Sequence, residues 1–162
     1  MDDPTFLTRA GILKRGILLF WWLWVTLVAL TNSVSELKAF GVMPQSWLFN
    51  SGNYSLIAHS TATFGTPAWV DRLLLLVVIL WQALASVLFW RALRAYHRRR
   101  PGRWPRIYVA FTVLLALFGA FMLSDEILHA YHVESAHREI AILLLVSVVA
   151  LYLLPDAAPI DA

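Results

Sequence analysis

The chain has 162 residues, of which 60% are hydrophobic and 14% are charged, and its formal net charge is +3. Soluble domains are less apolar and more highly charged than this, so the composition predicts an integral membrane protein. The sequence has no cysteine, which excludes disulfides, thiolate metal sites, iron–sulfur clusters and c-type haem attachment.

Four uncharged windows predict four transmembrane helices, because each approaches the roughly 17–25 residues that cross a bilayer core. None of them shows the alternation of polar and apolar residues that is typical of barrel strands. We therefore expect an all-α bundle of four transmembrane helices that forms a single integral membrane domain over residues 1–162. The windows are Gly16–Ser35, Leu73–Trp90, Ile107–Ser124 and Ile140–Pro155, and the fourth helix is expected to begin near residue 138.

The basic residues predict the orientation of these helices. Three of them precede the first window, and seven lie between the second and third windows with no acid among them. Basic loops stay in the cytoplasm, so both termini are expected inside a multi-pass protein of the cell inner membrane. The same rule accounts for the basic residues between the second and third windows, so these residues do not imply a nucleic-acid partner. We expect contacts with anionic lipid headgroups from Arg98, Arg99, Arg100 and Arg103.

The segment Val34–Val70 connects the first two windows on the predicted outer side. It is long, nearly uncharged and rich in aromatic residues, which argues against disorder. We expect this loop to lie on the outer membrane interface, with a short amphipathic turn around "PQSWLFN", residues 44–50.

An aromatic cluster, "FWWLW", lies in the first window. Trp21, Trp22 and Trp24 point in different directions around a helix, so no single face explains all three. Two readings remain open: a surface that contacts a lipid, a quinone or a pigment, and an interfacial belt in contact with lipid. In the second window Gln82 is expected to hydrogen-bond across a contact between helices.

The segment "SDEILHAYHVESAHREI" is the most polar part of the chain after the basic loop. On one continuous helix Asp125, His129 and His132 share a face, because they stand at positions i, i+4 and i+7. Carboxylate and imidazole are the ligands that Zn²⁺, Cu²⁺ or Fe²⁺ would take. The candidate metal ligands are these three residues with Glu126 and His137 on a neighbouring flank and His59 from the other outer loop.

The same segment also has a purely structural interpretation, which is an alternative to the metal site. Ser124 is suited to the N-cap of a helix, and Asp125 and Glu126 are suited to its first turn. In that reading the segment is only the polar turn that joins the third and fourth helices.

The first half of the chain resembles bacterial predicted small integral membrane proteins of unknown function. The stretches that carry the resemblance are "LFWWLWVTLVALTNSVSEL" and "LLLLVVILWQALASVLFWRAL", the second with Trp81, Gln82 and Ala83. The last third departs from the family pattern, since Ser124-Asp125-Glu126 stands where a Gly-Glu-Trp-like element is expected. The resemblance implies the four-helix topology and no activity.

The sequence therefore favours a non-catalytic accessory subunit of a larger inner-membrane complex, respiratory or photosynthetic, with lipids and other integral membrane subunits as partners. None of the four windows holds Asp, Glu, Lys, Arg or His, which disfavours ion-coupled transport. The alternative is an outer-face metal-binding protein or redox-enzyme subunit that uses the Asp/His segment. We predict no catalytic residue, and a divalent metal or a bound lipid, quinone or pigment is the cofactor that these readings imply.

Overall fold

The computed structural model describes residues 4–98 and 101–156, and of residues 4–8 and His132 it describes the backbone alone. Five helices make up nearly all of this part of the chain, which contains no strand. They are α1 (Pro4–Ala39), α2 (Asn53–Ala62), α3 (Ala68–His97), α4 (Arg103–Leu128) and α5 (Tyr131–Leu153). The four long helices are each long and apolar enough to cross a membrane. The prediction of four apolar helices is thus confirmed, and α2 is an addition to it.

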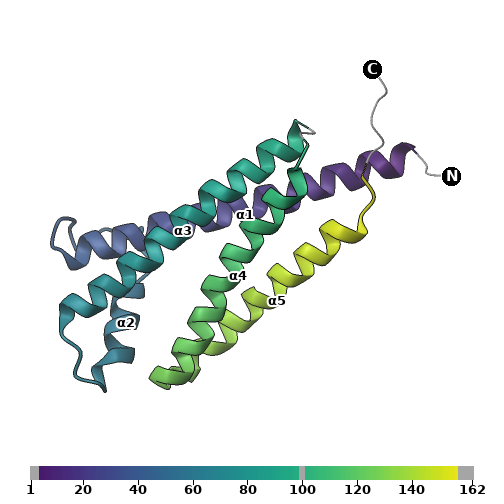
Figure 1. The fold of residues 1–162 in the computed structure, drawn as a ribbon. Coiled ribbons are helices and arrows are strands. Elements are labelled where there is room, and N and C mark those ends of the chain that lie inside the picture. Colours follow the sequence, from purple (N-terminus) through teal and green to yellow (C-terminus); the bar gives the residue numbers. More distant parts are fainter. Residues whose placement is uncertain (1–3, 99–100, 157–162) are drawn as a thin grey trace.

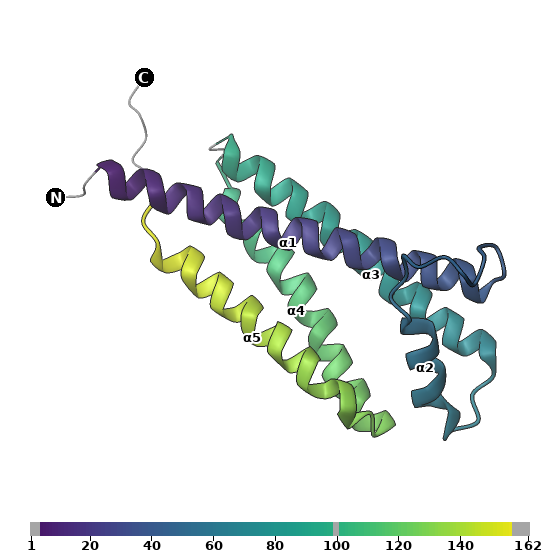
Figure 2. The same cartoon turned by 180° about the vertical axis from the view of Figure 1, so that it is seen from behind.

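The four long helices run up and down, so that the beginning of α1, the α3–α4 turn and the end of α5 lie at one end of the molecule (Figure 1). We call this the basic end, because Lys14, Arg94 and Arg103 are among its residues. The α4–α5 turn and α2 lie at the other end, called the α2 end here. Both views show the α1–α3 pair diverging from the α4–α5 pair toward the α2 end (Figures 1 and 2).

Aromatic and aliphatic side chains fill the centre of the bundle. Phe89 of α3 meets Phe111 of α4 edge to face, with ring centroids 4.9 Å apart, and both rings are buried. Such aromatic pairs gain about 0.5–1.5 kcal/mol beyond the burial of their area. The buried residues around them include Leu18, Val25, Leu114, Leu117, Phe118, Leu144 and Leu151.

Polar side chains join neighbouring helices within the apolar region. Thr26 of α1 and Ser86 of α3 share a hydrogen bond of 2.7 Å. The indole Nε1 of Trp81 donates to the carbonyl of Val113 in α4 at 2.9 Å. In hydrocarbon such bonds contribute about 0.6–2 kcal/mol each, so they fix the register of α3 between α1 and α4.

Helix α2 lies within the segment Val34–Val70, after the stretch at residues 44–50. The turn expected around residues 44–50 is present at its start, where the N–H of Trp47 donates to the carbonyl of Pro44 at 3.2 Å, and the helix begins later, at Asn53. Gly52 precedes it with φ 72°, a left-handed conformation that favours glycine. Asn50 and Ser51 each accept a backbone hydrogen bond two residues on, at Gly52 and Asn53. Local turn chemistry therefore ends the loop, and α2 packs on α1 and α3.

Candidate functional site

The α4–α5 turn breaks the helix on which the metal-site prediction depended. Helix α4 ends at Leu128, His129 takes a left-handed conformation with φ 53°, and α5 begins at Tyr131. Asp125 and His132 are thus on different helices, and the shared face expected of one continuous helix does not form. The N-cap prediction is also wrong, because Ser124 lies inside α4 and its hydroxyl donates to the carbonyl of Ala120 at 2.8 Å.

The turn brings Asp125 together with His137 instead. Their Oδ2 and Nδ1 atoms are 2.6 Å apart, and the Asp125 side chain is 7% exposed. The His137 ring lies 4.8 Å from the ring of Phe121, which holds its orientation. An imidazole oriented by a carboxylate on one nitrogen is the usual arrangement of a metal-binding histidine, whose other nitrogen takes the ion.

The remaining candidate ligands are dispersed. His129 is exposed beside Tyr131, Glu126 is exposed at the end of α4, and His59 is exposed on α2. The side chain of His132 lies outside the described residues. Among the side chains that are described, no group of three or more histidines and acids is placed to hold a metal ion. The structure supports a carboxylate–histidine pair rather than a complete coordination sphere.

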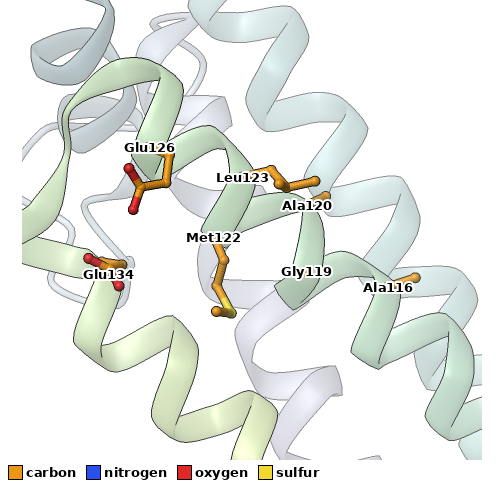
Figure 3. A pocket seen from close by; sticks show the side chains of 7 residues that line it. All are labelled: Ala116, Gly119, Ala120, Met122, Leu123, Glu126 and Glu134. Atoms are coloured by element: carbon orange, nitrogen blue, oxygen red, sulfur yellow. The ribbon is translucent and has the colours of Figure 1, made fainter.

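An open hollow of about 630 Å³ lies beside this turn on the outward surface of α4. Figure 3 shows Glu126 and Glu134 at the end of the hollow near the turn, with small residues further along α4. A Cβ added at Gly119 would meet nothing within 4 Å, so the hollow is open space. Its lining consists of Ala116, Gly119, Ala120, Met122, Leu123, Glu126 and Glu134.

The three tryptophans of α1 have different surroundings. Trp21 is 1% exposed, and its Nε1 donates to the hydroxyl of Ser147 in α5 at 2.9 Å. Trp22 is partly exposed and lies 4.8 Å from the ring of Trp90, while Trp24 is partly exposed beside Phe118. Trp21 is therefore committed to packing within the chain, and only Trp22 and Trp24 keep surface for lipid or another ligand.

A buried amide network lies at the α2 end, between α1, α2 and α3. Asn32 is fully buried, and its Nδ2 donates to Oε1 of Gln82 at 2.8 Å. Its Oδ1 accepts from Nδ2 of Asn53, the first residue of α2, at 2.7 Å. The expected hydrogen bond of Gln82 across a helix contact is confirmed. Asn32 is the residue that joins all three helices.

Both ends of α2 are attached by side chains. At its beginning the backbone N–H of Tyr54 donates to the hydroxyl of Ser35 in α1, at 3.3 Å. At its end the hydroxyl of Thr61 donates to Oδ1 of the buried Asp71 in α3, at 2.6 Å. Helix α2 is therefore fixed to both α1 and α3.

Glu36 and Arg72 lie at the same end with unsatisfied polar atoms. Glu36 is 5% exposed, and neither carboxylate oxygen has a hydrogen-bond partner among the described residues. The Nε of Arg72 is likewise buried without a partner in the described chain, and its guanidinium lies 5.0 Å from the Phe40 ring. Burying such groups costs free energy, so this part of the protein is able to take a proton or a hydrogen-bonding group that the described chain does not supply.

The sequence predicted the bond of Gln82 but not its partners, and Glu36 was left out because the uncharged window ended at Ser35. Asn32, Ser35 and Glu36 stand at positions i, i+3 and i+4, which places them on one face of a helix. That spacing was a signal that the polar face continued beyond the window.

The basic loop falls only partly within the described residues. Arg98 is exposed at the end of α3 and Arg103 begins α4, whereas Arg99 and Arg100 lie outside the described residues. Contacts of these four residues with lipid headgroups stay a prediction.

Comparison with protein-family models, with curated proteins and with solved structures gives no match for this chain.

Proposed function

We propose that this chain is a non-catalytic, membrane-embedded subunit that binds another integral membrane protein of the bacterial inner membrane. The observation that carries the proposal is the hollow on the outward surface of α4. Small residues let two transmembrane backbones approach closely, and this is how helices associate in lipid, where the hydrophobic effect supplies no driving force between them. Ala116, Gly119 and Ala120 offer such a surface.

The peripheral position of α5 also supports the proposal. In the most apolar window of α5, 11% of the residues are buried within the chain, against 33% for α4. Helix α5 is therefore the least covered of the four long helices, and with α4 it diverges from α1 and α3 (Figure 2).

Replacing Ala116 with phenylalanine is expected to abolish the association. The large ring would fill the hollow and separate the two backbones, while the chain itself has open space for it. Wild-type protein extracted in mild detergent should purify with a stoichiometric membrane partner, identified by mass spectrometry, and Ala116→Phe should lose that partner. Ala83→Phe is the matched control, because Ala83 is an exposed alanine of α3. Wild-type protein that purifies alone would contradict the proposal.

A second candidate function is metal binding at the α4–α5 turn, and the Asp125–His137 pair favours it. The further ligands that this function requires would have to come from residues near the pair in sequence, such as His129, His132 and Glu126.

In this case protein purified without chelators should carry close to one Zn²⁺, Cu²⁺ or Fe²⁺ per chain by elemental analysis. His137→Ala should lose the metal, because it removes the oriented imidazole. His97→Ala should keep it, since His97 lies at the basic end. Wild-type protein without metal would eliminate this function.

A further inference from the structure

At the basic end one carboxylate lies between two cations from different helices. Asp156 follows α5, and its Oδ1 is 2.9 Å from Nζ of Lys14 in α1. Its Oδ2 is 2.8 Å from a terminal guanidinium nitrogen of Arg103 in α4. Among the described residues Asp156 is the only acid at this end, where the other charged residues are basic. The three residues thus carry a net positive charge within a positive surrounding.

Aromatic rings hold both cations independently of Asp156. The Lys14 ammonium lies 4.9 Å from the centre of the Trp104 ring, and the Arg103 guanidinium lies 5.6 Å from that of Tyr96. Cations over aromatic faces are attracted by the negative face of the ring. Lys14 and Arg103 would therefore stay in position if Asp156 left.

Asp156 belongs to a segment that can move without unfolding a helix. Helix α5 ends at Leu153, and Leu154 is extended with ψ 135°. The Asp156 side chain is 30% exposed, whereas that of Lys14 is 1% exposed. The carboxylate therefore covers the buried ammonium from the surface side.

The carboxylate is in its charged form at neutral pH. Partial burial would raise the pKa of Asp156, but the hydrogen bonds and charges of Lys14 and Arg103 outweigh it and hold the pKa below its ordinary value. The anion contributes stability above its ordinary pKa, and this contribution is lost as the pH falls through the lowered value. In the physiological range Asp156 occupies the site as an anion.

We propose that Lys14 and Arg103 form a binding site for the phosphate group of an anionic phospholipid, which Asp156 occupies as an intramolecular competitor. The site lies where α1, α4 and α5 reach the end of their apolar spans, which is the depth of lipid phosphates. An arginine and a lysine that converge on one point suit a phosphate, since its oxygens accept several charge-assisted hydrogen bonds. The tail that carries Asp156 would then be released when such a lipid binds.

The first test is lipid retention, measured by native mass spectrometry of protein released from nanodiscs. Asp156→Asn should retain about fivefold more phosphatidylglycerol than wild type, which is the scale of one basic residue's attraction to an anionic lipid. Retention of phosphatidylcholine should not change. Adding Lys14→Gln to Asp156→Asn should remove the gain. Equal retention of phosphatidylglycerol by wild type and Asp156→Asn would overturn the proposal.

Glu139→Gln is the matched control, because it also removes one acid but lies in α5 away from this end. A similar gain in phosphatidylglycerol retention by this variant would show that net charge alone causes the effect, and it would overturn the proposed binding site. Competition with inorganic phosphate tests whether the site takes the phosphate of a lipid headgroup or free phosphate. We expect it not to displace phosphatidylglycerol from Asp156→Asn, and displacement at equal concentration would overturn the assignment to a lipid.

A second test uses the wild-type chain and does not depend on the folding of a variant. The amide of Leu154 donates to the carbonyl of Ala150 at 3.1 Å. If lipid displaces Asp156, hydrogen exchange at the amides of Leu154 and Asp156 should be faster in phosphatidylglycerol nanodiscs than in phosphatidylcholine nanodiscs. Equal exchange in the two lipids would overturn the competition.

Discussion

Replacing Trp21 with alanine is expected to produce the largest loss of stability of any single substitution in α1. The side chain is 1% exposed, and its ring contacts Phe111 and Trp24 edge to face at 6.4 and 5.6 Å. Truncation would leave a cavity, which costs about 3–5 kcal/mol for a buried tryptophan. It would also leave the Ser147 hydroxyl without the indole donor that joins α1 to α5.

The measurement is the thermal unfolding midpoint of the protein in detergent, which should fall by roughly 10 °C or more. Trp69→Ala is the matched control, because Trp69 is 65% exposed at the start of α3 and its removal leaves no cavity. Ser147→Ala should cost only about 1 kcal/mol, the size of one interhelical hydrogen bond. If Trp21→Ala were no more harmful than Trp69→Ala, the central packing described here would be incorrect.

Replacing Asn32 with alanine is expected to loosen both the α1–α3 contact and the attachment of α2. The substitution removes two hydrogen bonds at once and leaves the buried amide of Gln82 and the Nδ2 of Asn53 without their partner. An unsatisfied buried polar group costs about 1–3 kcal/mol. Thermal unfolding should therefore shift downward.

Hydrogen exchange across residues 53–62 should also become faster in Asn32→Ala, because α2 loses the side chain that holds its first residue. Ser33→Ala is the control for this variant. The Ser33 hydroxyl donates only to the carbonyl of Ala29 in its own helix, at 2.7 Å, so its loss should leave exchange in α2 unchanged. Unchanged exchange in Asn32→Ala would show that the loop, not the amide network, holds α2.

The sequence predicted the long helices well, because a run of apolar residues without charge leaves few alternatives in a membrane. It also predicted the hydrogen bond of Gln82, since a polar side chain within an apolar helix needs a partner. The orientation of the helices stays a prediction from charge asymmetry.

The candidate site was harder to predict, because it depends on where one helix stops. The break at His129 is made by a left-handed residue that is neither glycine nor proline, so no helix-ending signal marks it. A continuous helix put Asp125 beside His129, whereas the break puts it beside His137. The position of α2 was missed for a related reason, because its anchors, Asn32 and Asp71, belong to helices far apart in sequence.

The double attachment of α2 has a consequence for biogenesis. A ten-residue helix is not stable alone in water, so α2 depends on its anchors. One anchor, Asn32, is on α1 and the other, Asp71, is on α3, so both are in place only after these two helices have paired. Helix α2 is therefore expected to order only after α1 and α3 have paired, and in a chain where these two helices are mispaired it would lack an anchor.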